Sequence, residues 1–322
     1  MADPNSLPLA RSSVVAAHTL IAPYIHHTPV LTSTYLSNLA STPRTAAELA
    51  DTPWAGQPPA NPKIRFWFKC ENFQKVGAFK ARGAFHALLR LVESNHAQAV
   101  SLASATLKIP AHIVMPRIST PAKIAATQSY GARVLFSGST APEREAVVAD
   151  VIASTGATLI PPYDHPHVMI GQGTAGLELQ GQVVEAQKEG EGGGGVEWDY
   201  HPGTGIVVFG AEPEFEGADD CKRGLAAGKR IEVVKSLTIG DGLRTPVGAW
   251  PWKIKDTLRL VLERMKVVVE PSSVVGLAVA LWNEDFRRLV EKEQGEEVWD
   301  LGVVFTGGNV NLEGLGKLFE AK

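Results

Sequence analysis

An α/β fold is predicted for this chain, with two domains of parallel-rich, twisted sheets flanked by helices. Short apolar runs alternate with helical patterns through most of the sequence. Several helical patterns also stop at a glycine, such as Gly131 or Gly156, and a strand-like run follows. Strands joined by helices of this length form right-handed crossovers and hence parallel sheets.

The elements follow from these patterns in chain order. Ser12 or Ser13 can cap a first helix that reaches residue 21, and the alternating, β-favouring run at residues 64–71 indicates a strand. Later strands are expected at residues 111–116, 132–136, 158–160, 206–211, 267–269 and 301–305. Helices are expected at residues 84–93, 121–130, 141–155, 258–265 and 272–281, and residues 168–184 are expected to form a glycine-rich turn that leads into a helix. Residues 40–62 lack periodicity and are expected to form a surface loop or flexible insertion.

The composition is that of a soluble globular protein, with 44% hydrophobic and 20% charged residues. A formal net charge of −3 provides no basic field, which argues against nucleic acid as a partner. Cys70 and Cys221 lack the spacing of metal ligands and fit a reducing compartment. Neither a secretory signal nor an apolar run of about 20 residues is visible. We therefore expect a cytoplasmic protein without a membrane partner.

Lys80 stands where the strand at residues 64–71 gives way to a helical pattern. The positive end of a helix and the apolar side chain of Phe79 both disfavour an ammonium, so they are expected to lower the pKa of this amine. A neutral amine attacks carbonyls, and Lys80 therefore suits a Schiff base with an aldehyde cofactor. The same position also suits an ordinary surface lysine at a helix start.

The segment around this lysine, Lys-Val-Gly-Ala-Phe-Lys-Ala-Arg-Gly-Ala at residues 75–84, resembles the lysine motif of the serine/threonine dehydratase and serine racemase family. Other motifs share the resemblance in the same order: His-Thr-Pro-Val at 27–30, Gly-Gln-Gly-Thr at 171–174, Asp-Gly at 241–242 and Thr-Gly-Gly-Asn at 306–309. The resemblance implies the pyridoxal-phosphate fold type II, a small amino-acid substrate, a homodimer and, as in some relatives, ATP as an effector.

The resemblance also implies which residues hold pyridoxal 5'-phosphate. The family lysine carries the cofactor as an imine, and the implied cofactor-binding residues are Phe79, Lys80, Asn95, Gly192, Gly193, Gly194, Gly195 and Thr306. The four glycines would surround the phosphate with backbone N–H groups, although such a run is also typical of a flexible linker. Asn95 would bind the pyridoxal hydroxyl, but it suits a helix N-cap equally well.

Thr306 is the implied contact of the pyridine nitrogen, and its alternative role is that of a turn residue. A neutral hydroxyl leaves that nitrogen largely unprotonated, which favours prompt β-elimination over long-lived carbanion chemistry. Glu212, the Ala218 carbonyl and Asp220 are implied as a site for Mg²⁺ or Ca²⁺, for which oxygen ligands are suitable. Acidic residues at a helix start are also ordinary dipole-stabilising groups.

The implied reaction converts L-serine or L-threonine to a 2-oxo acid and ammonia. Lys80 would remove the Cα proton, after which the β-hydroxyl leaves. Racemisation needs a second base on the opposite face of the cofactor, and Ser94 is the residue that the resemblance offers. Residues 93–163 are expected to form a small inserted domain, and residues 1–92 with 164–322 a discontinuous, larger cofactor-binding domain.

The sequence also departs from the family pattern. A strand before Ser94 and another before Gly192 are absent from the pattern, and residues 249–256 are shortened, so the sheets are expected to be incomplete. Because a lost interior strand uncovers apolar helices, an inactive or destabilised deletion variant without tight cofactor binding is the alternative hypothesis. A third hypothesis is a sulfhydrylase or β-synthase, against which the Thr306 segment and the Glu212 and Asp220 pair argue.

Overall fold

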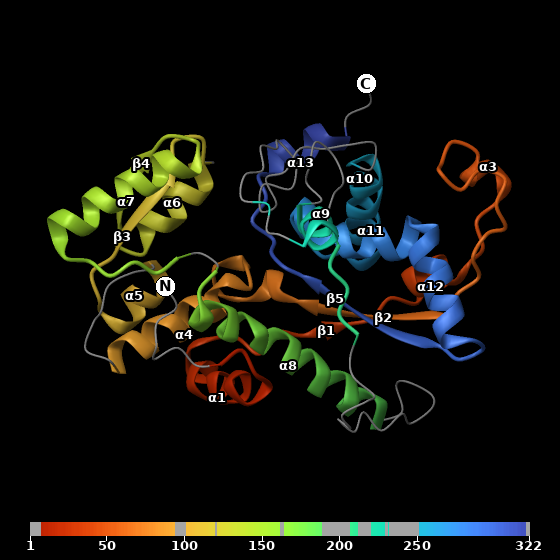
Figure 1. Ribbon diagram of the computed structural model, residues 1–322, viewed down its shortest axis with the longest axis horizontal. Helices are drawn as coiled ribbons and strands as arrows, with labels where there is room; N and C mark the ends of the chain where they lie inside the picture. Colours follow the sequence, from red (N-terminus) through yellow and green to blue (C-terminus); the bar gives the residue numbers. More distant parts are fainter. Residues whose placement is uncertain are drawn as a thin grey trace. The chain divides into compact units, whose positions relative to one another are not determined.

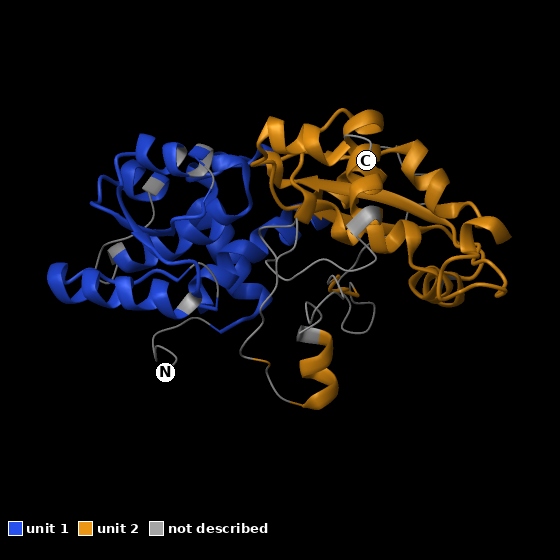
Figure 2. Ribbon diagram, turned by 90° about the horizontal axis from the view of Figure 1, so that it is seen from above, with its two compact units in different colours: residues 1–27, 73–180 blue, residues 28–72, 181–322 orange. Residues whose placement is uncertain are grey.

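The computed structural model describes residues 8–93, 101–119, 121–161, 164–188, 207–211, 220–228, 231 and 251–319. The chain divides into two compact units, which Figure 2 colours separately. Unit 1 comprises Met1–His27 and Phe73–Gln180, and unit 2 comprises Thr28–Asn72 and Gly181–Lys322. The expected inserted domain at residues 93–163 falls within unit 1, and its boundaries stay a prediction.

Unit 1 carries a parallel two-stranded sheet among helices (Figure 1). Its elements are α1 (Arg11–Ile21), the 3-10 turns η1 (Ala22–Tyr24) and η3 (Lys75–Gly77), α4 (Lys80–Glu93), α5 (Ser101–Leu107), β3 (His112–Pro116), α6 (Pro121–Ser129), β4 (Arg133–Ser137), α7 (Ala141–Thr155) and most of α8 (Pro166–Lys188). Helix α6 connects β3 to the parallel strand β4, as the sequence predicts. Gly131 and Gly156 adopt positive φ angles of 78° and 68°, the conformation in which glycine ends a helix.

Unit 2 is built around a three-stranded sheet of order β1-β2-β5. Its elements are β1 (Val30–Leu31), α2 (Thr34–Ser41), α3 (Ala46–Leu49), β2 (Ile64–Cys70), the 3-10 turn η2 (Glu71–Phe73), α9 (Asp220–Ala227), α10 (Pro251–Leu260), the π-helical turn η6 (Val261–Met265), the 3-10 turn η7 (Pro271–Val274), α11 (Val275–Trp282), α12 (Glu284–Gln294), β5 (Trp299–Phe305) and α13 (Leu312–Phe319). Strand β2 pairs parallel with β5 and antiparallel with β1.

The core of unit 2 forms where β2 is covered on both faces. Phe66, Phe68 and Cys70 are fully buried, and the Phe68 ring stacks on Phe305 with ring centroids 4.9 Å apart. Successive side chains of a strand point to opposite faces, so Phe66, Phe68 and Cys70 share one face and Arg65, Trp67 and Lys69 the other, which explains the alternation in residues 64–70. The α/β class with small, incomplete, parallel-rich sheets is therefore confirmed.

Residues 40–62 differ from the expected surface loop. The segment forms α3 and buries the apolar side chains of Ala40, Leu49, Trp54 and Ala60. Trp54 Nε1 donates a hydrogen bond to Asp285 Oδ1 at 2.9 Å. The prediction was wrong because a few separated apolar residues anchor the segment without producing a periodic pattern.

The prediction of a buried strand at residues 206–211 is also wrong for residues 207–211, which are the part that the structure describes. Residues 207–210 form no strand, and the side chains of Val207 and Val208 are 63% and 84% exposed. A strand is stabilised by a hydrogen-bonded neighbour, and no described strand pairs with these residues. Residues 158–160 and 267–269 likewise lie outside the strands of the described chain, although Val267 and Val269 are buried.

Candidate functional site

Lys80 is the first residue of α4, at the end of a turn that the sequence fixes tightly. Within that turn, Val76 and Gly77 have left-handed φ angles of 58° and 65°. The Gln74 side chain holds the turn, because its Oε1 accepts from the backbone N–H of His26 at 2.8 Å and its Nε2 donates to the His26 carbonyl at 2.8 Å. A β-branched residue such as Val76 adopts a positive φ only where its surroundings impose it.

The Lys80 side chain is exposed, and its Nζ lies 4.5 Å from the centroid of the Phe79 ring. The face of an aromatic ring attracts a cation, so Phe79 orients the lysine head group. An exposed primary amine at a helix start is a group that an aldehyde can reach. The roles of Phe79 and Lys80 in cofactor binding stay predictions.

Helix α4 is anchored by a buried ion pair two residues after Lys80. The Arg82 guanidinium is fully buried and donates from Nη1 and Nη2 to the two carboxylate oxygens of Glu178, each at 2.7 Å. Arg82 Nη1 also donates to Thr174 Oγ1 at 3.2 Å, and His18 Nε2 lies 3.1 Å from Glu178 Oε1. Two-point contacts between guanidinium and carboxylate have a defined geometry, so this pair fixes α4 against α8.

Glycines let α4 and α8 approach closely, and Figure 1 shows the two helices side by side. A Cβ added to Gly83 would lie 2.8 Å from the Val168 carbonyl oxygen. A Cβ added to Gly171 would lie 2.7 Å from the Arg82 carbonyl oxygen. The Gly-Gln-Gly-Thr motif at residues 171–174 lies inside α8 and not in the glycine-rich turn that was expected, and it packs against the helix that begins with Lys80.

Thr306 follows the last residue of β5 in unit 2, where the carboxyl ends of the parallel strands β2 and β5 meet. The Thr306 side chain is half-buried, and its Oγ1 lies 3.1 Å from Oγ of Ser273 in η7. Ser273 Oγ also donates to the Gly307 carbonyl at 2.8 Å and accepts from the Gly307 N–H at 2.9 Å. The carboxyl end of parallel strands is the usual location of ligand sites in α/β sheets.

Asn72 lies beside this strand end. Its Nδ2 donates to the Val268 carbonyl at 3.1 Å, whereas its buried Oδ1 has no hydrogen-bond partner among the described residues. Gly308 is in close contact, because a Cβ added there would lie 3.2 Å from the Asn72 Cβ. Sequence reasoning missed both Asn72 and Ser273. The position of Asn72 two residues after β2, beside the strand that ends before Thr306, was the signal that could have found it.

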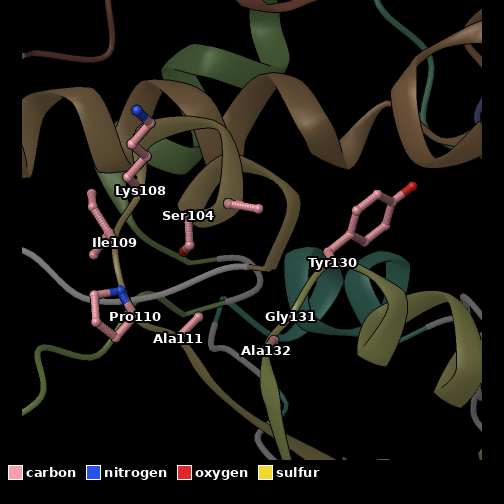
Figure 3. A pocket seen from close by; sticks show the side chains of 9 residues that line it. Ser104, Lys108, Ile109, Pro110, Ala111, Tyr130, Gly131 and Ala132 are labelled. Atoms are coloured by element: carbon pink, nitrogen blue, oxygen red, sulfur yellow. The ribbon is translucent and has the colours of Figure 1, made fainter.

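Unit 1 also contains a pocket of about 210 Å³, which no predicted site residue lines (Figure 3). It is lined by Ser104, Ala105, Lys108, Ile109, Pro110, Ala111, Tyr130, Gly131 and Ala132. None of these residues belongs to the predicted site, so the pocket contributes nothing to the assignment of the cofactor.

Several predicted site residues fall outside the described part of the chain. These are Ser94, Asn95, Gly192, Gly193, Gly194, Gly195, Glu212 and Ala218, together with the Asp-Gly motif at residues 241–242. Asp220 begins α9, but the structure does not describe its side chain. The described residues hold no group of three His, Cys, Asp or Glu side chains that could bind a metal ion. They also contain no helix with the length and apolar character that a membrane span requires.

Comparisons with known proteins decide the family. Residues 48–298 match the sequence profile of the family described as "Pyridoxal-phosphate dependent enzyme". The chain belongs to this family. It is 34% identical to the serine racemase of Arabidopsis thaliana, over 96% of each protein. It is 35% identical to the L-threo-3-hydroxyaspartate ammonia-lyase of Pseudomonas sp, over 79% of this chain and 88% of the relative.

Solved structures agree with the family assignment. Maize serine racemase superposes with a TM-score of 0.72 at 30% identity, over 95% of each chain. The threonine deaminase of T.th. superposes with a TM-score of 0.69 at 32% identity, over 94% of this chain and 99% of the other. The predicted resemblance to the serine/threonine dehydratase and serine racemase family is thereby confirmed.

Taken unit by unit, the described residues carry groups that suit the cofactor that the family name specifies. Pyridoxal phosphate requires an accessible primary amine, which exposed Lys80 provides. Its pyridine nitrogen requires a polar partner, and Thr306 offers a half-buried hydroxyl that contacts another neutral hydroxyl, that of Ser273. The unpartnered Asn72 Oδ1 adds a buried acceptor beside the same strand end.

Proposed function

We propose that this pyridoxal-phosphate-dependent enzyme removes ammonia from small hydroxy amino acids, with L-serine and L-threonine as substrates. The observation that carries the proposal is the placement of Lys80 as the exposed first residue of a helix anchored by the buried Arg82–Glu178 pair. A rigidly held helix start keeps a reactive group in one position. The similarity to ammonia-lyases and threonine deaminase supports the reaction type.

Each residue has a separate role in the proposed reaction. Pyridoxal phosphate, when bound, supplies an aldehyde for the substrate amine and a conjugated ring that accepts electrons from Cα. Lys80 would hold the cofactor before substrate arrives, and its Nζ would then take the proton from the substrate Cα. That proton balances the one that the β-hydroxyl needs to leave as water, and a second water would be consumed to release ammonia and the 2-oxo acid. The uncharged Thr306 hydroxyl would contact the pyridine nitrogen.

Racemisation of serine is the second candidate activity, because the Arabidopsis and maize relatives are named serine racemases. It requires a second base, for which we propose Ser94, on the face opposite Lys80. Asn95 and the glycines 192–195 are proposed to bind the pyridoxal hydroxyl and the phosphate. These residues lie outside the described chain, so their roles rest on the family resemblance.

Four finer properties are proposed on the same basis. Glu212, the Ala218 carbonyl and Asp220 would bind Mg²⁺ or Ca²⁺, which prefer oxygen ligands. ATP would act as an effector, the protein would form a homodimer, and it would be located in the cytoplasm. The inactive deletion variant is not favoured, because the similarity to the Arabidopsis relative extends over 96% of both proteins.

Cofactor binding tests the proposal directly. We expect purified protein with added pyridoxal phosphate to absorb visible light, and borohydride to abolish this absorbance and fix the cofactor on the peptide that contains Lys80. Lys80→Arg should remain folded but show neither result. A wild-type protein that stays colourless with excess cofactor would contradict the proposal and revive the inactive variant.

Substrate assays then separate the candidate activities. Ammonia release should be measured with L-serine, L-threonine and L-threo-3-hydroxyaspartate, and D-serine formation with L-serine. Ammonia from the first two substrates supports the dehydratase, whereas D-serine supports the racemase. Turnover of L-threo-3-hydroxyaspartate alone would contradict L-serine and L-threonine as substrates and would show that the enzyme acts on an acidic hydroxy amino acid.

A further inference from the structure

Ser273 has an unusual concentration of hydrogen bonds around one hydroxyl. Ser273 lies in η7 and is only 2% exposed. Its Oγ contacts Thr306 Oγ1 and both the N–H and the carbonyl of Gly307. All three residues belong to unit 2. Thr306 is the residue assigned above to the pyridine nitrogen, so the inference rests on the proposed function.

Counting protons limits what this cluster can do. The Gly307 N–H can only donate, so Ser273 Oγ accepts that bond. Ser273 has a single proton for two candidate acceptors, the Gly307 carbonyl at 2.8 Å and Thr306 Oγ1 at 3.1 Å. If Ser273 donates to the Gly307 carbonyl, Thr306 must donate its own proton to Ser273. The Thr306 oxygen then has only lone pairs to offer to a ligand. If Ser273 donates to Thr306 Oγ1 instead, Thr306 accepts from Ser273, and its own proton points outward.

We propose that Ser273 is a positioning residue that sets the direction of the Thr306 hydroxyl. In the structure the Ser273 hydroxyl gives its proton to the Gly307 carbonyl. When the pyridine nitrogen of the cofactor lies beyond Thr306, the Ser273 hydroxyl would turn to donate to Thr306 Oγ1 instead, and Thr306 would donate to that nitrogen. The Gly307 carbonyl would keep the bond from the Glu270 N–H at 2.9 Å. The bonds then run in one direction from Gly307 N–H through Ser273 and Thr306 to the ring. Hydrogen bonds in such a chain polarise one another, which makes the last donor stronger.

The neighbouring serine supplies a matched control. Ser272 is adjacent in sequence and in the same 3-10 turn, but its hydroxyl donates to Glu270 Oε1 at 2.9 Å instead of contacting Thr306. Ser272→Ala therefore removes a hydroxyl from the same turn and leaves the relay intact. Ser273→Thr retains the relay hydroxyl and tests whether that group is sufficient.

The experiment is a double-mutant cycle on cofactor affinity. The dissociation constant for pyridoxal phosphate and the absorbance maximum of the bound form are measured for wild type, Ser273→Ala, Thr306→Val and the double variant, with the melting temperature of each apo protein as the measure of folding. We expect Ser273→Ala to weaken cofactor binding about fivefold, the usual worth of one hydrogen bond, and to shift the absorbance maximum. In the Thr306→Val background the same change should have no further effect on affinity.

The outcomes are distinguishable. An equal loss of affinity from Ser273→Ala in both backgrounds, or no loss in either, would overturn the relay while leaving the cofactor assignment intact. A loss matched by Ser272→Ala would show a general effect of the turn and would also overturn it. Restored affinity in Ser273→Thr supports the relay, and its failure in a folded protein counts against it. A wild type that binds no cofactor overturns both the proposed function and the relay.

Discussion

Arg82 and Glu178 form a buried, two-point ion pair that joins α4 to α8. Their side chains are 0% and 2% exposed, and both guanidinium-to-oxygen distances are 2.7 Å. Because Lys80 begins α4, the pair determines where that helix start is held within unit 1. A buried charge whose partner is removed has no water to replace the lost interaction, so each partner depends on the other.

Arg82→Ala should therefore destabilise the protein strongly. We expect the free energy of unfolding to fall by ~3–5 kcal/mol, because the Glu178 carboxylate would remain buried without its guanidinium. Chemical denaturation measures the loss. Glu313→Gln is the control, since it breaks the exposed Lys317–Glu313 pair, which should contribute less than ~1 kcal/mol. Similar losses in the two variants would show that the Arg82 pair has no special role.

The close contact of α4 and α8 gives a second prediction. Gly171→Ala should reduce the free energy of unfolding by ~1–3 kcal/mol, because the new methyl group meets the Arg82 carbonyl oxygen and the Cα of Gly83. Gly176→Ala, in the same helix but facing open space, should instead raise stability by up to ~1 kcal/mol. Thermal unfolding of the two variants in parallel checks the difference in sign.

Much of the fold could be predicted from the sequence because local patterns determine it. Glycine stops such as Gly131 and the alternating pattern of β2 are local features, and the structure has them where the sequence places them. The burial of Trp54 and the exposure of Val208 depend on partners distant in the chain, which periodicity does not contain.

The site was predictable only in part. Lys80 and Thr306 stand next to recognisable motifs, and their places at a helix start and a strand end agree with the prediction. Ser273 is brought to Thr306 across 33 residues of sequence, and its Ser-Ser context matches an ordinary helix start. The roles of all three in the reaction stay predictions until cofactor binding is measured.

Burial determines the chemistry of Cys70 and its dependence on pH. It raises the pKa of the Cys70 thiol from 9.0 to about 12. We expect the peptide containing Cys70 to resist alkylation at pH 8 in the folded protein and to react in denaturant, as mass spectrometry of the peptides would detect. Alkylation of the folded protein at the rate of the denatured one would contradict the prediction.

The raised thiol pKa also predicts a loss of stability in alkali. Between pH 9 and about 12 the unfolded thiol is ionised while the folded one keeps its proton, so the unfolded state binds fewer protons. The contribution of this thiol to stability is therefore complete below pH 9 and declines as the pH rises, by at most ~1.4 kcal/mol per pH unit. Cys70→Ala should show a flatter decline than wild type over the same range in denaturation curves.

Trp54 is predicted to be the residue that fixes the segment at residues 40–62. Its side chain is 5% exposed and donates to Asp285 on α12. Trp54→Phe should cost ~1 kcal/mol of unfolding free energy for the lost hydrogen bond. Trp54→Ala should cost ~3–5 kcal/mol and expose the segment to limited proteolysis, because the cavity adds to the lost burial.

Exposed Gln57 provides the control, since Gln57→Ala should change stability by less than ~0.5 kcal/mol. Equal protease resistance of Trp54→Ala and wild type would mean that the segment is held by other contacts, such as the bond from the Ala60 N–H to Glu284 Oε2 at 2.7 Å.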